Sequence, residues 1–333
     1  MKIISISQST VRLLVACGCA LSFAFMGSQQ AKAEWPEKPI TMMVGYSAGG
    51  GTDTYARALA SFMHEQLGQP MVVVNKPGAA SAIAAKAVMN SRSDGYTLFI
   101  INGGTFLAKS MMLGDKAPAT PLKDMQPLGG VGQFVTALMV PMDSPFKKPQ
   151  DLIAHAKANP GKLRWSHPGR GSVNMLAGAL FMQENDITAQ DVPFKSGPKA
   201  RNAVVSKQVD FAFTGIHSMA GFESKIRALG VTNSERDKIF NKVPTFGELG
   251  LPALNIAAPM VVWGKTDLPP EAVTKLKAAI KAIASSKSYQ RILKKAGAVG
   301  FYQSNEQVVE TMEVMRTKFS PIVAELKANM KKK

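Results

Sequence analysis

The chain has 333 residues, 40 of them basic and 23 acidic, and a formal net charge of +17. Its two cysteines, Cys17 and Cys19, both lie within the first 33 residues, so the remaining 300 residues contain no disulfide, thiol nucleophile or cysteine metal site. The four histidines are scattered without the spacing of metal ligands. We therefore expect neither a metal site nor a cofactor.

The first 33 residues have the pattern of a secretory signal peptide. Lys2 and Arg12 form a positive start, residues 13–26 are an apolar run, and Ala31-Lys32-Ala33 is a small-x-small cleavage site. We predict export to the periplasm with cleavage after Ala33. A lipoprotein box ending at Cys17 is the alternative, but too few apolar residues separate it from Arg12.

Removal of this segment removes three basic residues and no acidic one, which leaves a net charge of +14. A basic balance favours nucleic acid, an anionic membrane or a small acidic molecule as partner. Nucleic acid is not expected, because the chain is predicted to be exported and shows no interleaved aromatic and basic motif. No later apolar run approaches membrane-spanning length, so we expect no membrane insertion after cleavage.

The sequence is organised around residues 40–53, which read ITMMVGYSAGGGTD. Ile40–Val44 predicts a buried strand, Gly49–Gly51 a bare loop, and Thr52 or Asp53 the cap of a helix. This order directs unpaired backbone N–H groups, and the positive end of the helix dipole, at one point in space. Such a point is an anion-binding site.

Two catalytic motifs and one structural reading compete with simple anion capture here. The stretch nearly fits a phosphate loop, but Gly51 stands where the lysine is required. It also contains GxSxG around Ser47, the pattern of a serine esterase, although no earlier strand of the mature chain supplies an oxyanion-hole loop. A glycine turn with only a structural role is the third alternative. We expect a binding protein and no enzyme.

Three strand–loop–helix units follow one another in the first part of the mature chain. The second strand is expected over 71–74 with a helix over 81–89, and the third over 96–101 with a glycine loop at 102–105 ahead of another helix. Uninterrupted apolar strands alternating with helices predict a parallel, doubly wound α/β sheet. Ligands of such sheets bind at the carboxyl ends of the strands, where these loops lie.

A second unit is expected to start near Gly132. Its loop Gly169–Ser172 follows a short strand over 163–166, with Ser172 as the cap of the next helix, so it is a second anion-seeking helix start. Asn174 occupies the third glycine position of a dinucleotide fingerprint, and we reject that reading. The other expected elements are strands over 134–140, 209–213, 228–231 and 256–263, and helices over 149–159, from Pro198, and over 270–285, 289–296 and 305–330.

Several short motifs recur here in an order typical of one family. They include VxYxAGGxxD at 44–53, NKPGA at 75–79, DGYTL at 94–98, LKD at 122–124, HAKANPGK at 155–162, LAG at 176–178 and VPT at 243–245. The chain resembles the extracytoplasmic solute receptors of tripartite tricarboxylate transporters, also called Bug receptors, from Trp35 to its C-terminal helices.

The resemblance implies a type II periplasmic binding protein with two α/β lobes and a ligand cleft between them. Lobe 1 would comprise residues 34–133 and 257–333, and lobe 2 residues 134–256. The implied function is a monomeric periplasmic receptor that captures a small organic carboxylate, such as a di- or tricarboxylate, and delivers it to integral-membrane permease subunits. An orphan receptor that feeds a sensor is the alternative within this class.

The resemblance also implies where the ligand would bind, since family members hold a carboxylate between one loop of each lobe. The expected binding residues are Tyr46, Ser47, Ala48, Gly49, Gly50, Asp53, Ala80, Ser81, Asn102, Gly104, Thr105, Gly169, Arg170, Gly171, Ser172, Lys195, Ser196, Gly197 and Thr214.

The chain departs from the usual family pattern in four places. Gly45 replaces a proline, Ser81 replaces a glycine, and Thr214-Gly215 replaces an acidic residue or an asparagine pair. Arg170 replaces a small or polar residue, and it would either fork onto a second carboxylate or remain an exposed loop side chain.

Overall fold

The computed structural model describes residues 34–331, so the expected signal peptide lies outside the described part of the chain. The described residues from Lys38 onward belong to one compact unit, and this unit is described here. Within the described residues, no helix combines the length and the apolar character that crossing a bilayer would require.

The first group of strands, sheet A, is built as the apolar runs predict. Strand β1 pairs in parallel with β2 on one side and β3 on the other, and β3 then pairs antiparallel with β9. The bounds are β1 Ile40–Val44, β2 Met71–Asn75, β3 Thr97–Asn102 and β9 Ala257–Lys265, and the connecting helices are α2 Gly51–Leu67, α3 Ala82–Met89 and α4 Gly103–Leu113. The loops after β1 and β3 therefore meet at one edge of the sheet.

The second group, sheet B, has the same parallel core. Strand β5 pairs in parallel with β6 and β7, and β4 pairs antiparallel with β7 and β8. The bounds are β5 Arg164–His167, β6 Gln190–Pro193, β7 Phe211–Gly215 and β8 Ile226–Val231, and the helices are α5 Pro149–Ala158, α6 Val173–Glu184 and α7 Gly197–Val205.

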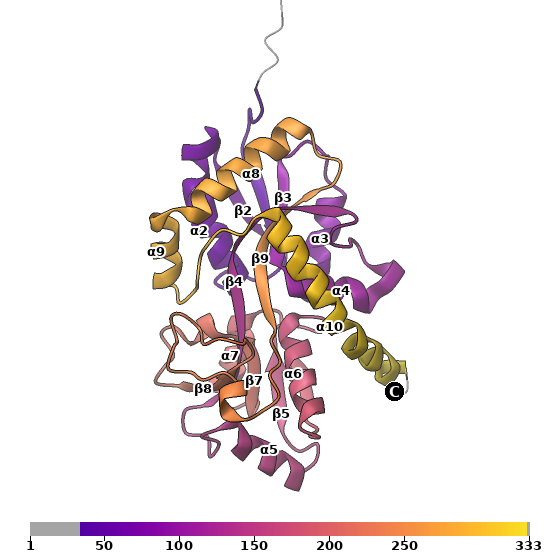
Figure 1. The fold of residues 1–333 in the computed structure, drawn as a ribbon, viewed down its shortest axis with the longest axis vertical. Helices are drawn as coiled ribbons and strands as arrows, with labels where there is room; N and C mark the ends of the chain where they lie inside the picture. Colours follow the sequence, from indigo (N-terminus) through magenta and orange to yellow (C-terminus); the bar gives the residue numbers. More distant parts are fainter. Residues whose placement is uncertain (1–33, 332–333) are drawn as a thin grey trace, which may run out of the picture. The chain divides into compact units, whose positions relative to one another are not determined.

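One long strand, β4 (Met125–Pro141), joins the two sheets. It pairs antiparallel with β9 through its first half and with β7 and β8 through its second half. Figure 1 shows β4 and β9 running side by side from one group of strands to the other. The full strand order is β2-β1-β3-β9-β4-β7-β5-β6, with β8 beside β4.

The sequence reading of β4 was incomplete, because it placed a strand only over 134–140. Gly129 and Gly132 have φ near +153° and +154°, and the register with β9 shifts beside both glycines. A side chain on Gly132 would collide with the ring of Tyr55 and the carbonyl oxygen of Val299. Close packing therefore explains why glycine occupies these positions in β4. The same glycines interrupt the apolar pattern, so the sequence does not identify this part of the strand. Strand β6 was also missed.

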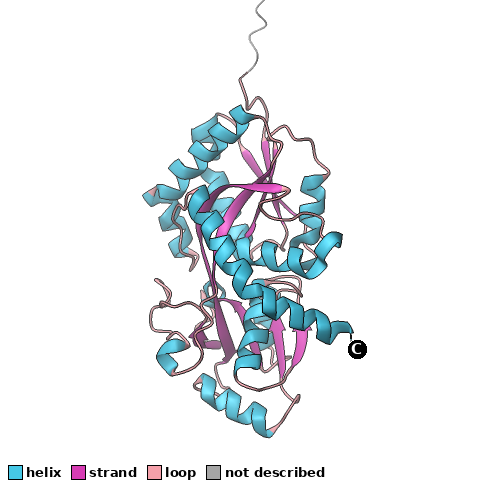
Figure 2. Ribbon diagram, turned by 45° about the vertical axis from the view of Figure 1, so that its right-hand side comes forward, coloured by secondary structure: helices cyan, strands magenta, loops and turns pink. Residues whose placement is uncertain are grey.

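The C-terminal helices cover sheet A and part of sheet B. They are α8 Pro270–Ser285, α9 Lys287–Lys295 and α10 Asn305–Lys331, and α10 packs along α4, β4 and β9 (Figure 2). Gly103 and Gly104 lie inside α4, where a Cβ would meet Met312 and Met315 of α10. The expected glycine loop at 102–105 is thus wrong: both glycines are helical and allow close helix packing.

Candidate functional site

Helix α2 begins at Gly51, directly after β1 and its glycine loop. Its N-cap is Gly50, with extended backbone angles and no side-chain cap. The expectation that Thr52 or Asp53 caps the helix is wrong, because both lie within its first turn. The amides of this turn have no intrahelical acceptor, and the positive end of the dipole points the same way.

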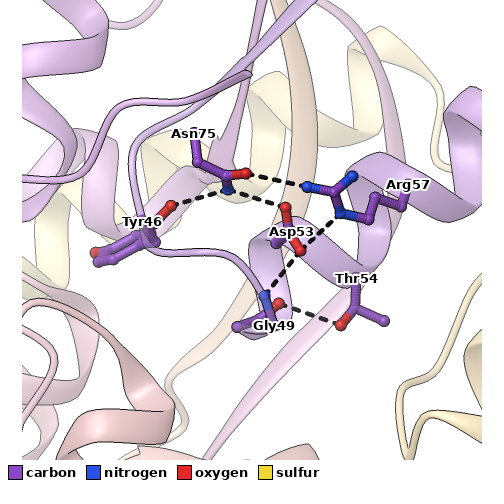
Figure 3. Close-up of polar contacts among 7 residues, drawn as sticks. Tyr46, Gly49, Asp53, Thr54, Arg57 and Asn75 are labelled. Carbon is purple, nitrogen blue, oxygen red and sulfur yellow. Dashed lines mark hydrogen bonds and ion pairs between the residues drawn. The ribbon is translucent and has the colours of Figure 1, made fainter. Parts of the chain in front are cut away.

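The Asp53 side chain holds the loop in place through contacts within the protein (Figure 3). Its carboxylate accepts hydrogen bonds from Gly49 N (2.9 Å), Arg57 Nε (2.9 Å) and Asn75 Nδ2 (2.9 Å). Asn75 Nδ2 also donates to the Tyr46 carbonyl oxygen (3.0 Å), so both ends of the loop are fixed. This corrects the expectation that Asp53 and the Gly49 amide contact a ligand: the protein itself pairs both.

Replacement of Asp53 by asparagine is expected to reduce stability by about 1–3 kcal/mol at pH 7. Burial alone would raise the pKa of Asp53, but the hydrogen bonds from Arg57, Gly49 and Asn75 outweigh it and lower the pKa. The charged Asp53 carboxylate therefore stabilises the fold fully at a pH above its unfolded-state pKa of about 3.9. This stabilisation is lost as the pH falls through the lower pKa of Asp53 in the folded protein.

Urea unfolding of both proteins at pH 7 and in acid measures this difference. The difference in the free energy of unfolding between wild type and Asp53→Asn should become smaller in acid. An equal gap at every pH would show that the carboxylate charge does not hold the loop.

The α2 N-terminus opens into a small cavity of about 30 Å³. The residues come from both sheets: the first loop and α4 on one side, and the segments after β5, β6 and β7 on the other. Charged side chains are absent from this lining among residues 34–331. It consists of Tyr46, Gly50, Gly51, Thr52, Asn102, Thr105, Phe134, Pro168, Asn174, Gly197, Thr214 and His217.

Thr214 places an unpaired hydroxyl at this cavity. The residue is 1% exposed, and its Oγ1 has no hydrogen-bond partner within the described residues. Leaving a buried hydroxyl unpaired costs about 1–3 kcal/mol, so it signals a partner that the folded chain does not itself provide. The Thr214 hydroxyl and the α2 amides are neutral hydrogen-bond donors at one cavity.

His217 closes the same cavity from the turn that follows β7. Its ring packs against Gly51, where a Cβ would collide with it, and lies 5.2 Å from the Phe134 ring. Burial, with a smaller contribution from the Arg201 charge, lowers the pKa of His217 to about 4. The ring is therefore neutral at physiological pH and adds no positive charge to the site.

Two of the four amides of the second predicted loop are already used by the protein. Gly169 N donates to His167 Nδ1 (3.2 Å), and Ser172 N donates to the Gly169 carbonyl (3.1 Å). Ser172 is the cap of α6, as predicted, and Val173 N donates to the Thr105 hydroxyl (3.1 Å). The expectation of a second free helix start at Gly169–Ser172 is therefore wrong for Gly169 and Ser172.

Arg170 is also occupied. Its Nε and Nη2 donate to the two carboxylate oxygens of Asp191, at 2.9 and 3.2 Å. The buried His167 Nε2 lies 3.5 Å from the same carboxylate, and the neighbouring His167 ring together with the hydrogen bonds from Arg170 holds the pKa of Asp191 well below its usual range. Of the two alternatives for Arg170, a fork onto a ligand carboxylate or an exposed loop side chain, the fork is made in this structure to a carboxylate of the protein.

A second cavity, of about 270 Å³, shares the Tyr46 and Pro168 walls with the first. It brings together the predicted residues Ala80, Gly169, Arg170 and Lys195, and adds Lys109. Ala79, Ala80 and Ser81 are consecutive residues with positive φ, between +48° and +73°, and the first two line this cavity. Strained backbone of this kind is concentrated at ligand sites.

Gly45 and Ser81, two positions at which the sequence analysis expects a departure from the resembled family, contact each other. A Cβ on Gly45 would collide with the Ser81 side chain, so the serine fills the space that a larger residue at 45 would need.

The predicted residues thus fall into three sets. Tyr46, Gly50, Asn102, Thr105, Gly197 and Thr214 line the first cavity, and Ala80, Gly169, Arg170 and Lys195 line the second. Those outside both linings are Ser47, Ala48, Gly49, Asp53, Ser81, Gly104, Gly171, Ser172 and Ser196, the last of which caps α7 through Lys199 N.

The binding residues predicted from the sequence omit several that line the cavities. In the first they omit Gly51, Thr52, Phe134, Pro168, Asn174 and His217, and in the second Gly45, Gly78, Lys109, Pro168, Pro193 and Phe194. His217 follows the carboxyl end of β7, which is the position where ligands of α/β sheets bind, so that signal could have found it.

The crossing strands and the cavity between the loops of two sheets define a two-lobed α/β solute-binding protein. Residues 55–327 match the family described as "Tripartite tricarboxylate transporter family receptor". The chain belongs to this receptor family, in its Bug branch, and its fold is that of the type II periplasmic binding proteins, as the sequence predicted.

Individual relatives agree with this assignment. A protein encoded in the gbd 5′ region of Cupriavidus necator is 30% identical over 89% of this chain and 90% of its own length. Protein BugT of Bordetella pertussis is 28% identical over 97% of this chain and its full length. Among solved structures, MatC from Rhodopseudomonas palustris with bound malate has a TM-score of 0.80 at 27% identity, covering 87% and 100% of the two chains. The R. palustris protein Rpa4515 with adipate has a TM-score of 0.81 at 26% identity, covering 89% and 99%.

Proposed function

We propose that this protein is a periplasmic receptor that binds a small organic carboxylate between its two lobes and delivers it to a membrane permease. The observation that carries the proposal is the uncapped start of α2 facing the unpaired Thr214 hydroxyl across a cavity without charged side chains. An array of neutral donors at a helix N-terminus stabilises a carboxylate without a lysine or arginine.

The energetics of such an array are sufficient. A micromolar ligand requires about 8 kcal/mol of net binding free energy. Hydrogen bonds to a charged group contribute roughly 1.5–3 kcal/mol each, so four or five donors supply enough after the entropy of association is subtracted.

The lobes are proposed to comprise residues 34–133 with 257–333, and 134–256. The pairing of β4 with β9 in one sheet and with β7 and β8 in the other supports these bounds. Residues of the two proposed lobes approach each other at the site, since Gly51 lies against His217 and Gly50 lies near Pro198. A ligand that bridges them would stabilise this closed arrangement, which a permease then recognises. The protein is expected to reach the periplasm after cleavage at Ala33 and to act as a monomer.

A calorimetric screen tests the proposal on the protein without residues 1–33. We expect binding by at least one member of a panel of mono-, di- and tricarboxylates, and none by the corresponding amides. Failure of every acid to bind, with no small acid retained in native mass spectrometry, would refute the carboxylate function.

The esterase reading of Ser47 has less support from the geometry. A serine nucleophile requires a general base within hydrogen-bond reach. Within residues 34–331, no hydrogen bond joins the Ser47 side chain to a histidine. Labelling of Ser47 by a fluorophosphonate would favour the enzyme. The receptor feeding a sensor differs only in its membrane partner, so a pull-down on detergent-solubilised permease subunits separates the two.

A further inference from the structure

Helix α9 presents a row of basic side chains from a firmly anchored position. Its inner face carries Tyr289 and Leu293, both fully buried, and the Tyr289 hydroxyl donates to the Val131 carbonyl at 2.8 Å. Figure 1 shows α9 at the margin of the ribbon, beyond the end of α8. The opposite face, which we call the α9 basic face, carries exposed residues at i, i+4, i+7 and i+8, namely Lys287, Arg291, Lys294 and Lys295.

The α9 basic face has no counter-charge among the described residues. None of its four side chains forms an ion pair with residues 34–331. The sequence from 272 to 305 contains no acidic residue, and Glu271, just before it, lies 3.2 Å from Lys275. The positive charge of the face is therefore directed to solvent.

Helix stability alone does not favour this arrangement. Lys287 and Arg291, and again Arg291 and Lys295, are like charges at i, i+4, which destabilise a helix. Lys287 also lies in the first turn, where the positive end of the dipole disfavours a cation. Lys294 and Lys295 lie in the last turn and do gain from the dipole. An external anion would offset the cost of the other two cations.

The composition of the face fits a lipid surface better than a protein partner. Protein interfaces are centred on apolar or aromatic anchors that become buried in the complex. Ile292, at 40% exposure, is the only apolar side chain of α9 that is exposed. Cations on long flexible stems, spread along a helix, can meet a plane of phosphate headgroups without a fixed partner geometry.

We propose that the α9 basic face docks the protein reversibly on an anionic phospholipid bilayer. Each Lys or Arg beside such a surface strengthens binding about fivefold, so the four together contribute a factor on the order of several hundred. An attraction of this size permits release, and salt screens it. The inference goes beyond the carboxylate site and does not depend on which ligand binds there.

Co-sedimentation with protein-free vesicles tests the docking, with the protein without residues 1–33. We expect binding to vesicles made of equal parts of phosphatidylcholine and phosphatidylglycerol, and none to vesicles of phosphatidylcholine alone. The binding should be strong at about 50 mM NaCl and lost at about 500 mM, because the range of the electrostatic attraction shrinks with salt.

Two matched double variants locate the docking surface. Lys287→Gln with Arg291→Gln should weaken binding to the anionic vesicles about 25-fold and keep the fold, since both side chains are exposed. Lys157→Gln with Lys162→Gln removes the same charge from exposed positions in α5 and the turn after it, and should weaken binding about twofold or less. Neither pair lines a cavity, so both should keep the carboxylate affinity of the wild type.

Absence of binding to the anionic vesicles at low salt would overturn the proposal. An equal loss in the two double variants would also overturn it, because the net charge of the whole protein, and not α9, would then drive the binding. Binding to native membranes but not to vesicles of their extracted lipids would assign the face to an acidic segment of a membrane protein instead.

Discussion

Replacement of Gly51 by alanine is expected to weaken carboxylate binding roughly five- to 150-fold while the protein stays folded. A Cβ at this position would collide with the His217 ring, which reaches Gly51 from the opposite sheet. Overpacking of this kind costs about 1–3 kcal/mol. Here it destabilises the form of the protein in which Gly51 contacts His217, which is the form proposed to bind the ligand. Open forms, in which Gly51 and His217 are apart, would be unaffected.

A double-mutant cycle isolates this contact. His217→Ala in the Gly51→Ala background should restore part of the lost affinity, because it removes the colliding ring. Gly247→Ala is a matched control, since its Cβ would meet Ala253 at an ordinary 3.7 Å and it lines neither cavity. No loss in Gly51→Ala, or no recovery in the double variant, would contradict the closed contact across the site. Calorimetry measures affinity, and circular dichroism confirms folding.

Replacement of Thr214 by valine is expected to move stability and affinity in opposite directions. Valine has nearly the same shape but no hydroxyl, so the ligand-free protein loses a buried unpaired group and gains up to about 1–3 kcal/mol of stability. The same change removes a donor to the carboxylate and should weaken binding by about 1.5–3 kcal/mol, or roughly tenfold to 150-fold. A residue with a purely structural role would not show this pair of effects.

Thr232→Val is the control for the Thr214 experiment. Thr232 is equally buried, at 1% exposure, but its hydroxyl donates to the Ile256 carbonyl at 3.1 Å, and it lines neither cavity. This variant should lose stability and keep its affinity. If Thr214→Val behaves in the same way as Thr232→Val, the Thr214 hydroxyl is not part of the binding site.

The sequence predicted the parts of the molecule that depend on local pattern. Apolar runs marked β1, β2 and β3, and the glycine loop marked the start of α2, although the predicted side-chain cap was wrong. Glycines read as loops were harder to assign, because a glycine chosen for close packing looks the same as one chosen for a turn. Gly103 and Gly104, which were read as a loop but lie in α4 against α10, are examples.

The composition of the site could be predicted only in part. The rule that ligands bind at the carboxyl ends of strands predicted two of the lining residues correctly. Asn102 and Thr214 both lie at such ends, and both line the first cavity. Whether a polar group there is free depends on tertiary partners. Arg170 is paired because β6 places Asp191 beside it, and Asp53 is paired because β2 ends at Asn75. His217 follows the carboxyl end of β7, so the same rule could have identified it, although the residues that surround it depend on tertiary packing.

The central claim is that the backbone amides at the start of α2 hold a ligand carboxylate. An NMR titration of ¹⁵N-labelled protein, with the acid identified by the screen, observes these amides directly. We expect the signals of Gly50, Gly51 and Thr52 to move downfield as the acid is added, with the largest changes in the protein at or near them. A saturable titration in which these three signals stay fixed while others move would contradict the account.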